Sequence, residues 1–420
     1  MRNTAYWRDK KVTIVGLARS GRACAELLRG LGCAVAVSDN QDTDATRKNA
    51  EALRRLSITV ELGSHSRELL CGCDLIIVSP GVPDDALPLV WAKEQGIPAV
   101  SEIEAAWTLM PCPVIAVTGS SGKTTVTTLI GEVLRASGKR VHVLGNIGTP
   151  LSSAVADMRP GDYCVAEVSS FQLERIKTFK PRVAVVTNIS KNHLDRYASM
   201  QDYIIAKKRI FINQDREDFL VINDEDRMVR DFALEARSQA VYFRADQELN
   251  ANQACVTAVA DVLGIPRSAC RAVFNDFKGL EHRMEQVAIV RGVNFINDSK
   301  ATTVESCIWA LRSITQPVVL ICGGRDKGVD YSLVVSAARR KVKAAVLIGE
   351  AKEKIRASLA GAVPVFEEAT LPRAVACAFE QASAGDCVLL SPMCSSYDMF
   401  TDYEERGRVF KKAVNELAKG

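Results

Sequence analysis

A run of mostly β-branched residues at 114–118 leads directly into a loop with two glycines and then into Lys123, Thr124 and Thr125. A helical pattern of apolar residues follows over 126–134. A strand, a glycine-containing loop and a helix in this order form a phosphate-binding loop, because backbone N–H groups at the helix N-terminus face anionic oxygen. Lys123 supplies a charge for the terminal phosphates, and the Thr124 hydroxyl is placed to bind Mg²⁺. The stretch therefore predicts an α/β domain that binds a nucleoside triphosphate.

This loop is shorter than the common P-loop, because Val117 stands where that motif has its first glycine. An ordinary strand-to-helix turn that happens to carry glycine and lysine is the alternative. We favour the phosphate-binding loop because the strand, the loop, the Lys-Thr pair and the helix occur in register. The expected contacts to ATP from this loop are Gly119, Ser120, Ser121, Gly122, Lys123, Thr124 and Thr125.

The bulk composition excludes several classes of function. At 420 residues the chain is long enough for two or three domains with real cores. Its net charge is +4, from 54 basic and 50 acidic residues, which is not the pattern of a nucleic-acid-binding protein. No apolar stretch approaches the roughly 20 residues of a membrane span. The 13 cysteines include no Cys-x-x-Cys pair and mostly stand in apolar runs, so we expect small core residues and a reducing cytoplasm.

The first hundred residues predict a dinucleotide-type βαβ unit. A strand at 11–17 is followed by a glycine turn at 16–21 and a helix, and a second strand ends on Asp39. Ala18 stands where the dinucleotide-binding fingerprint has its second glycine, so the turn is a weak signal for NAD. It is a better signal for a site that binds the phosphates of another nucleotide. A doubly wound domain with no ligand at the turn is the alternative. A further strand is followed by a stiff loop at Ser79, Pro80 and Gly81. This loop would lie at the edge of the sheet where ligands bind, and a plain turn without a ligand is an equally open alternative.

Polar side chains follow three further strands of the central region. Asn146 comes after a strand that ends at Leu144, and Glu167 ends an apolar strand. A carboxylate in this place of a P-loop domain is where Mg²⁺ is usually bound, and a purely structural role is the alternative. His193 follows a strand at 183–187, so we interpret it as a ligand rather than an ordinary hydrogen-bonding residue.

The remainder of the central region is less informative. A helix is predicted at 203–211 and carries Lys207. Residues 214–250 show no pattern that we can assign, and a further helix is predicted at 249–263.

A hinge at 279–283 and a hairpin over 284–297 open the last part of the chain. Thr302 and Thr303 are placed to cap a helix that spans residues 304–311. Strands that alternate with helices predict a second doubly wound sheet, at 318–322, 344–348 and 387–391. The predicted fold class is α/β with three domains, which are a Rossmann-like doubly wound domain at 1–101, a central P-loop ATPase-like mononucleotide-binding domain at 102–279 and a Rossmann-like domain at 280–420.

Several loops together resemble those of one known family. They are Thr-Gly-Ser-Ser-Gly-Lys-Thr-Thr at 118–125, Gly-Asn-Ile-Gly at 145–148, Glu-Val-Ser-Ser-Phe-Gln-Leu at 167–173, Asn-His-Leu-Asp-Arg-Tyr at 192–197, His-Arg at 282–283, Asn-Asp-Ser-Lys-Ala-Thr at 297–302, Gly-Gly-Arg-Asp-Lys-Gly at 323–328 and Leu-Leu-Ser-Pro at 389–392. This set resembles the Mur ligase family over nearly the whole chain.

The resemblance implies an ATP-dependent ligase that joins an acid and an amino acid in peptidoglycan precursor synthesis. Its implied substrates are ATP, UDP-N-acetylmuramoyl-L-alanine and D-glutamate, its implied cofactor is Mg²⁺ as two ions, and an acyl phosphate is the implied intermediate. A monomer in the cytoplasm, without nucleic-acid or membrane partners, is expected.

The resemblance also implies roles for individual residues. The implied catalytic residues are Lys123, His193, Lys207, Arg283 and Lys300. The implied ATP contacts beyond the phosphate-binding loop are Asn252, Arg283 and Asp298. The implied contacts to the UDP-linked substrate are Arg19, Ser20, Ser79, Pro80, Gly81, Asn146 and His193. The implied amino-acid contacts are Thr302, Lys327, Ser396, Tyr397 and Tyr403. The implied metal ligands are Thr124, Glu167, His193 and Lys207 as a carbamate.

Other functions remain open at this stage. Another Mur ligase is one alternative, and a folylpolyglutamate-type ligase, which shares the central machinery, is a second. A P-loop NTPase that couples hydrolysis to movement would turn over ATP without an amino acid. A degenerate dehydrogenase-like module would bind a nucleotide and hydrolyse nothing. Phosphate release from ATP with and without the two other substrates separates these classes.

Overall fold

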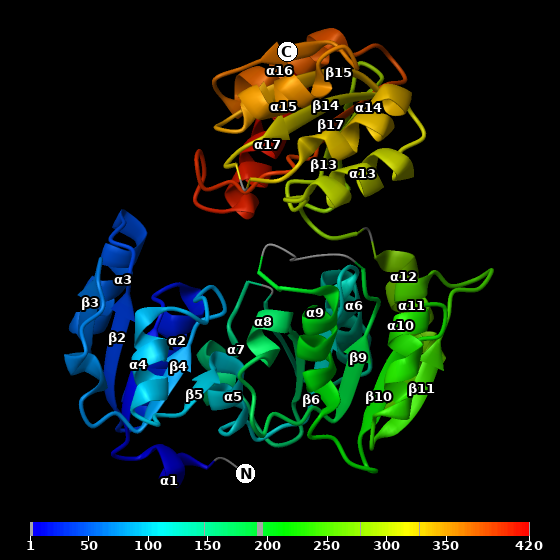
Figure 1. Ribbon diagram of the computed structural model, residues 1–420. Coiled ribbons are helices and arrows are strands. Elements are labelled where there is room, and N and C mark those ends of the chain that lie inside the picture. Colours follow the sequence, from blue (N-terminus) through cyan, green and yellow to red (C-terminus); the bar gives the residue numbers. More distant parts are fainter. Residues whose placement is uncertain (1–2, 147, 191–195, 278, 327, 420) are drawn as a thin grey trace. The chain divides into compact units, whose positions relative to one another are not determined.

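The computed structural model describes residues 3–146, 148–190, 196–277, 279–326 and 328–419 (Figure 1). The chain divides into two compact units, Met1–Phe277 and Lys278–Gly420. Three sheets with helices on their faces make up the fold, so the predicted three-domain α/β class is confirmed. None of the helices within the described ranges is long and apolar enough to cross a membrane.

The N-terminal sheet has five parallel strands in the order β3-β2-β1-β4-β5. Its elements are α1 Thr4–Trp7, β1 Lys11–Val15, α2 Arg19–Gly30, β2 Ala34–Asp39, α3 Asp44–Arg54, β3 Thr59–Leu62, β4 Leu75–Val78, α4 Leu87–Glu94, β5 Ala99–Ser101 and α5 Glu102–Trp107. The strand order changes direction between β1 and β4. Ligands of open α/β sheets bind outside the carboxyl ends of the strands at such a point, so the loops after β1 and β4 form the candidate ligand edge.

The central sheet has six parallel strands in the order β11-β10-β9-β6-β8-β7. Its elements are β6 Val114–Thr118, α6 Lys123–Ala136, β7 Val141–Gly145, α7 Leu151–Ala154, β8 Tyr163–Glu167, α8 Ser170–Leu173, β9 Val183–Val186, α9 Met200–Lys208, β10 Phe219–Asn223, α10 Arg227–Arg230, β11 Gln239–Phe243, α11 Ala251–Val262 and α12 Arg267–Asp276.

Strand β6 is buried over its whole length, because it packs against a hydrophobic core on each face. Val114 and Ala116 join the core that continues under the N-terminal sheet, whereas Ile115 and Val117 join the core beneath α6, α11 and α12. Successive side chains of a strand point to opposite faces, so a strand covered on both faces is a continuous apolar run. This burial fixes the phosphate-binding loop that follows β6 at the edge of a rigid sheet.

Glu104 ties the N-terminal part of the first unit to its central part. It lies on α5, is 4% exposed, and accepts hydrogen bonds from the backbone N–H groups of Lys177, Thr178 and Phe179 at 2.8–2.9 Å. A buried carboxylate is tolerated where several donors satisfy it. The segment after β5 is therefore held in the body of the central sheet rather than left as a free linker.

The C-terminal unit has a six-stranded sheet in the order β12-β13-β17-β14-β15-β16, in which only β12 runs antiparallel to its neighbour. Its elements are β12 Glu285–Val290, β13 Val293–Asn297, α13 Val304–Ser313, β14 Val318–Gly323, α14 Val335–Lys341, β15 Val342–Ile348, α15 Lys352–Leu359, β16 Val365–Glu367, α16 Leu371–Gln381, β17 Cys387–Leu390 and α17 Tyr403–Leu417. Hydrophobic cores cover both faces, one beneath α13 and α15 and the other beneath α16 and α17.

Some expected boundaries were wrong. The helix expected at 203–211 begins at Met200 and ends at Lys208, after which the chain tightens into a 3₁₀ turn, Arg209–Phe211. Residues 214–250, which carried no assignable pattern, include the two strands β10 and β11. The outer strand, β11, lies at the end of the sheet and is only partly buried.

The expected role of the cysteines as small core residues is confirmed. Every cysteine is a free thiol, and all but Cys71, Cys73 and Cys377 are buried.

Candidate active site

The phosphate-binding loop joins β6 to α6. Gly122, which precedes the helix, has a φ of 78°, a left-handed conformation that a side chain would strain. Lys123 opens the helix, and its Nζ donates to the carbonyl oxygens of Gly119 at 3.0 Å and Ser120 at 3.2 Å. The ammonium group therefore lies over the loop. Together with the backbone N–H groups of a helix N-terminus, it provides the charge that nucleotide phosphates require.

Glu167 receives two hydrogen bonds at the carboxyl end of β8. Thr124 donates from Oγ1 to Oε2 at 2.7 Å, and Asn146 donates from Nδ2 to Oε1 at 2.8 Å. The carboxylate is 2% exposed. A carboxylate beside a hydroxyl is a set of hard oxygen donors, and it stands next to the loop that suits phosphates. These residues fit a Mg²⁺ ion that accompanies a nucleotide.

Lys207 points into the same loop from α9. Its side chain is 2% exposed, and its Nζ donates to the carbonyl oxygen of Gly119 at 2.9 Å and to Oγ1 of Thr118 at 3.3 Å. Lys208, the next residue, instead pairs with Glu235. Adjacent residues of a helix point about 100° apart, so only one of the two lysines faces the loop.

The surroundings of Lys207 favour its neutral form. Burial lowers the pKa of Lys207 well below its usual range, and the nearby charge of Lys123 lowers it further, whereas Glu167 raises it. The Nζ atom also lies 4.7 Å from the centroid of the Tyr203 ring. A desolvated amine that loses its proton readily is a nucleophile toward small electrophiles.

Two asparagines lie against the phosphate-binding loop. A Cβ atom at Gly122 would lie 2.8 Å from Oδ1 of Asn252, which places this predicted ATP contact beside the loop. Asn188 was not selected from the sequence, although its Oδ1 accepts from the backbone N–H of Ser121 at 2.9 Å. Its position directly after a predicted strand was the available signal.

The predicted contacts to the UDP-linked substrate lie on two loops of the N-terminal sheet. Arg19 and Ser20 are the first residues of α2, after the turn that follows β1. The loop 79–81 follows β4, and its Ser79 donates from Oγ to the carbonyl oxygen of Gly16 at 3.1 Å. This hydrogen bond joins the two loops, so they form one continuous edge.

Two predicted site residues, His193 and Lys327, lie outside the described residues. Their predicted roles stay predictions.

Asp298 and Arg283 lie together in the C-terminal unit. The Asp298 carboxylate accepts from the backbone N–H of Met284 at 3.2 Å and from Oγ of Ser391 at 3.1 Å. Burial raises the pKa of Asp298 to about 7, although these hydrogen bonds and the nearby Arg283 oppose the rise. The Nε of Arg283 is buried and has no hydrogen-bond partner among the described residues. An unpaired cationic donor of this kind fits an anionic ligand.

The described amino-acid candidates come from loops after β13 and β17, which are neighbours in the sheet. Lys300 lies with its Nζ 5.3 Å from the centroid of the Tyr403 ring, and its backbone N–H donates to the carbonyl oxygen of His282. Ser396 is buried, whereas Tyr397 is 66% exposed. Thr302 stands between Lys300 and the capping residue of α13. These loops lie at one edge of the C-terminal sheet.

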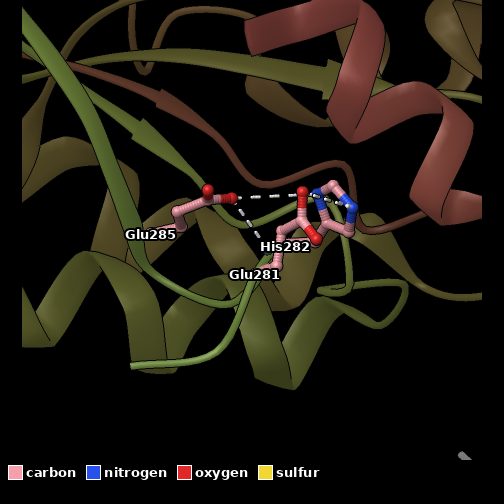
Figure 2. A group of neighbouring side chains, drawn as sticks. All are labelled: Glu281, His282 and Glu285. Carbon is pink, nitrogen blue, oxygen red and sulfur yellow. Dashed lines mark hydrogen bonds and ion pairs between the residues drawn. The ribbon is translucent and has the colours of Figure 1, made fainter. Parts of the chain in front are cut away.

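A group of possible metal-binding side chains stands at the start of the C-terminal unit, made up of Glu281, His282 and Glu285 (Figure 2). Its ligand atoms lie within 4.8 Å of one another. The ammonium of Lys411 already bridges the two carboxylates, at 2.7 Å from Glu281 and 2.8 Å from Glu285. The group is therefore satisfied as an ion-pair network that attaches the start of the unit to α17.

Arg406 holds the loops that follow β13 and β17 in the C-terminal unit. It was not selected as a site residue from the sequence. It is fully buried and donates to Oγ and the carbonyl oxygen of Ser299, at 3.0 and 2.8 Å, and to the carbonyl oxygen of Cys394 at 3.2 Å. Burial lowers the pKa of Arg406 to about 10. Backbone carbonyl acceptors leave no mark in a sequence, so this role could not be predicted.

The fold and the site define a class of protein. A phosphate-binding loop lies on a parallel sheet, next to a carboxylate that suits Mg²⁺, and a second doubly wound unit carries polar loops. This combination is typical of an enzyme that transfers a phosphoryl group from a nucleotide.

Three family models match the chain. They are described as Mur ligase MurD-like N-terminal domain over residues 10–101, Mur ligase middle domain over 117–262 and Mur ligase glutamate ligase domain over 282–394. The chain belongs to the Mur ligase family, whose members are ATP-dependent, Mg²⁺-using ligases that form carbon–nitrogen bonds.

Similar proteins support this assignment over the full length. A protein of Geotalea daltonii is 42% identical over 98% of this chain and 99% of its own, and one of Koribacter versatilis is 39% identical over 98% of each. Both are named UDP-N-acetylmuramoylalanine–D-glutamate ligase. Among solved structures, UDP-N-acetylmuramate-alanine ligase of Thermotoga maritima has a TM-score of 0.61 at 19% identity over 97% of this chain and 99% of that one. MurF of Acinetobacter baumannii has a TM-score of 0.57 at 14% identity over 100% and 93%. These structures share the fold.

Proposed function

We propose that this chain joins D-glutamate to UDP-N-acetylmuramoyl-L-alanine with ATP, in peptidoglycan precursor synthesis. The observation that carries the proposal is the meeting of Thr124 and Asn146 at Glu167, beside a phosphate-binding loop that both Lys123 and Lys207 enter. The names of the full-length relatives support the choice of substrates. In this proposal the chain has three domains with boundaries near 101 and 279, which bind the UDP-linked substrate, ATP and the amino acid in that order.

The chemistry begins with phosphorylation of the acid. A carboxylate oxygen of the muramoyl-L-alanine attacks the γ-phosphorus of ATP, the bond to the β,γ-bridging oxygen breaks, and ADP leaves. The amine of D-glutamate, after loss of a proton, attacks the acyl carbon. The tetrahedral intermediate then expels inorganic phosphate and leaves an amide. The attacking carboxylate and the triphosphate of ATP are both anions and repel each other, so the protein acts mainly through positioning and charge neutralisation.

Individual residues take defined parts in this scheme. Lys123 neutralises charge on the transferred phosphoryl group. Thr124 and Glu167 would hold one Mg²⁺, and a second ion would be held by His193 and by Lys207 as a carbamate. Mg²⁺, when bound, reduces the repulsion between the phosphate and the attacking carboxylate.

The other candidate residues bind the three substrates. The ATP contacts are completed by Asn252, Arg283 and Asp298. The UDP-linked substrate is bound by Arg19, Ser20, Asn146, His193 and the loop Ser79, Pro80 and Gly81. The amino acid is bound by Lys300, Thr302, Lys327, Ser396, Tyr397 and Tyr403. The enzyme acts as a monomer in the cytoplasm, without nucleic-acid or membrane partners.

Phosphate release from ATP tests the proposal. Release should require UDP-N-acetylmuramoyl-L-alanine and D-glutamate together, and a panel of other amino acids should give none. Turnover of ATP alone would favour an NTPase of another class. Turnover with a different amino acid would indicate another ligase of the family.

A further inference from the structure

Arg196, which belongs to the central part of the first unit, holds a loop of the N-terminal sheet. Its Nη1 donates to the carbonyl oxygen of Pro80 at 2.7 Å, and its Nη2 donates to that of Val82 at 3.0 Å. The two acceptors belong to the loop that follows β4 and are more than 110 residues away along the chain. A planar guanidinium donates from two nitrogens at a fixed spacing, so this contact sets the orientation of the loop as well as its position.

The guanidinium is itself held in place. Its Cζ lies 4.2 Å from the centroid of the Phe171 ring, and its Nη2 lies 3.7 Å from a carboxylate oxygen of Glu174. The hydroxyl of Tyr197 donates to the other carboxylate oxygen of Glu174, and the Tyr197 ring stacks on that of Phe171. Stacking on an aromatic face and pairing with a carboxylate both favour this orientation of the guanidinium. We name Arg196, Phe171, Glu174 and Tyr197 the arginine clamp.

The loop held by the clamp is not an isolated turn. Ser79, its first residue, is 5% exposed and donates to the carbonyl oxygen of Gly16 at 3.1 Å. Gly16 opens the turn between β1 and α2, so a displacement of the loop at Pro80 also displaces the turn that faces the phosphates in our proposal. The clamp thus reaches both loops of the N-terminal ligand edge from the central sheet.

We infer that Arg196 is a positioning residue for the UDP-linked substrate, and this inference rests on the proposed function. Arg196 orients the loop 79–82 from outside the N-terminal sheet, and the loop in turn orients the uridine diphosphate. Lysine cannot replace it, because an ammonium is a point charge without the fork that spans two carbonyl oxygens.

A second arginine provides a matched control. Arg209 donates from Nε to the carbonyl oxygen of Leu173 at 2.8 Å and from Nη2 to that of Ile176 at 2.6 Å. It is partly buried and holds two backbone carbonyls like Arg196, but both acceptors lie within the central part of the chain. Arg209→Lys therefore measures what the loss of such a fork costs when the two acceptors lie outside the loop 79–82.

The experiment compares the full-length Arg196→Lys and Arg209→Lys variants with the parent. Calorimetry measures the Kd for UDP, and initial rates give kcat and each KM. We expect Arg196→Lys to raise the Kd for UDP and the KM for UDP-N-acetylmuramoyl-L-alanine about tenfold or more, with the KM for ATP within about twofold of the parent. Arg209→Lys should leave all of these constants near parental values. Phe171→Leu, which removes the stacking face, should shift the UDP constants in the same direction.

Each outcome decides the question. An unchanged Kd for UDP in Arg196→Lys overturns the inference, and so does an equal rise in the KM values for ATP and the UDP-linked substrate, since a general distortion would produce it. If Arg196→Lys does not fold, Phe171→Leu decides by the same two constants. A parent that binds UDP but performs no ligation defeats the proposed function and leaves the Kd comparison valid, whereas a parent that binds no UDP defeats both.

Discussion

The hydroxyl of Thr124 donates a 2.7 Å hydrogen bond to Oε2 of Glu167, so the first turn of α6 meets the end of β8 at one carboxylate. Glu167 is almost fully buried, and its other oxygen accepts from Asn146. The position of the carboxylate is therefore fixed by two different segments of the chain. A group that is fixed before a ligand arrives costs little reorganisation when it neutralises charge.

Glu167→Gln tests the role of this carboxylate. Glutamine keeps the size of the side chain but removes the negative charge that suits Mg²⁺. We expect kcat to fall about 10²-fold or more and the Mg²⁺ concentration for half-maximal activity to rise. Thr124→Ser, which keeps the hydroxyl, is the control and should retain most activity. A Glu167→Gln variant with parental kcat and parental Mg²⁺ dependence would contradict the assignment.

Lys123→Ala should remove turnover and leave binding of the UDP-linked substrate nearly intact. The charge of Lys123 counts chiefly where negative charge builds on the transferred phosphoryl group, so we expect kcat to fall ~10²-fold or more. Lys139→Ala, at an exposed position after the same helix, should be neutral in the same assay. Near-parental kcat in Lys123→Ala would show that the loop does not bind the reacting phosphates.

Local signals in the sequence predicted much of this site. Asn146 was selected because it follows a strand and Glu167 because it ends one, and the structure joins them by a hydrogen bond. Parallel strands carry their loops at one edge of a sheet, so a strand end is a strong guide to position. A helix cap at Thr302 or Thr303 was predicted for a similarly local reason, and it is the Thr303 side chain that accepts from the backbone N–H of Ser306.

The parts that could not be predicted depend on distant backbone atoms. Arg196 donates to the carbonyl oxygens of Pro80 and Val82, and every residue carries such an oxygen, so the sequence holds no signal of the pairing. The sequence predicted a helix that ends at residue 211, whereas α9 ends at Lys208, and the reason for this difference is another one. The chain tightens into a 3₁₀ turn at Arg209, and helix boundaries of this kind depend on hydrogen-bond geometry rather than on residue type.

Asp298 should make stability depend on pH. Burial raises its pKa from 3.8 to about 7, so between these values the native state keeps a proton that the unfolded chain has lost. The free energy of unfolding therefore falls as the pH rises through this range, by at most roughly 4 kcal/mol. Asp298→Asn removes this contribution, and its amide can accept from Met284 and donate to Ser391.

Thermal unfolding of the full chain at pH 5 and pH 8 tests this prediction. The Tm of the parent should fall more between these values than the Tm of Asp298→Asn, because groups common to both proteins cancel in the comparison. Parallel pH dependence in the two proteins would show that Asp298 titrates at its ordinary value.

Gly407 is required by the packing of His282. A Cβ atom at Gly407, within α17, would lie 2.1 Å from Nδ1 of His282, and that nitrogen also lies 2.9 Å from Nδ2 of Asn297. Gly407→Ala should therefore displace the ring and destabilise the C-terminal unit by about 1–3 kcal/mol. Gly30→Ala, at a helical glycine with open space around it, is the control and should not lower the Tm.

A double variant separates the clash from other effects of Gly407→Ala. Adding His282→Ala removes the ring, so the further cost of Gly407→Ala in that background should be small. If the double variant instead loses the sum of the stability losses of the two single variants, the ring is excluded as the cause.

The last prediction concerns Lys207, whose buried amine points at the phosphate-binding loop while Lys208 pairs with Glu235 at the surface. Burial lowers the pKa of Lys207, and the nearby Lys123 lowers it further. A neutral amine adds CO₂ and releases one proton, which leaves an anionic carbamate whose oxygen atoms suit Mg²⁺. Lys207→Ala should abolish ligation, and Lys208→Ala should change little.

Two measurements distinguish a carbamate from an unmodified lysine. Acetate or formate should partly restore the activity of Lys207→Ala, because a small carboxylate can occupy the place of the lost ligand, and neither should affect Lys123→Ala. Carbon-13 NMR of the parent in labelled bicarbonate should show one carbamate signal that Lys207→Ala lacks. Parental activity in Lys207→Ala, or full activity of the parent in CO₂-free buffer without that signal, would refute the carbamate.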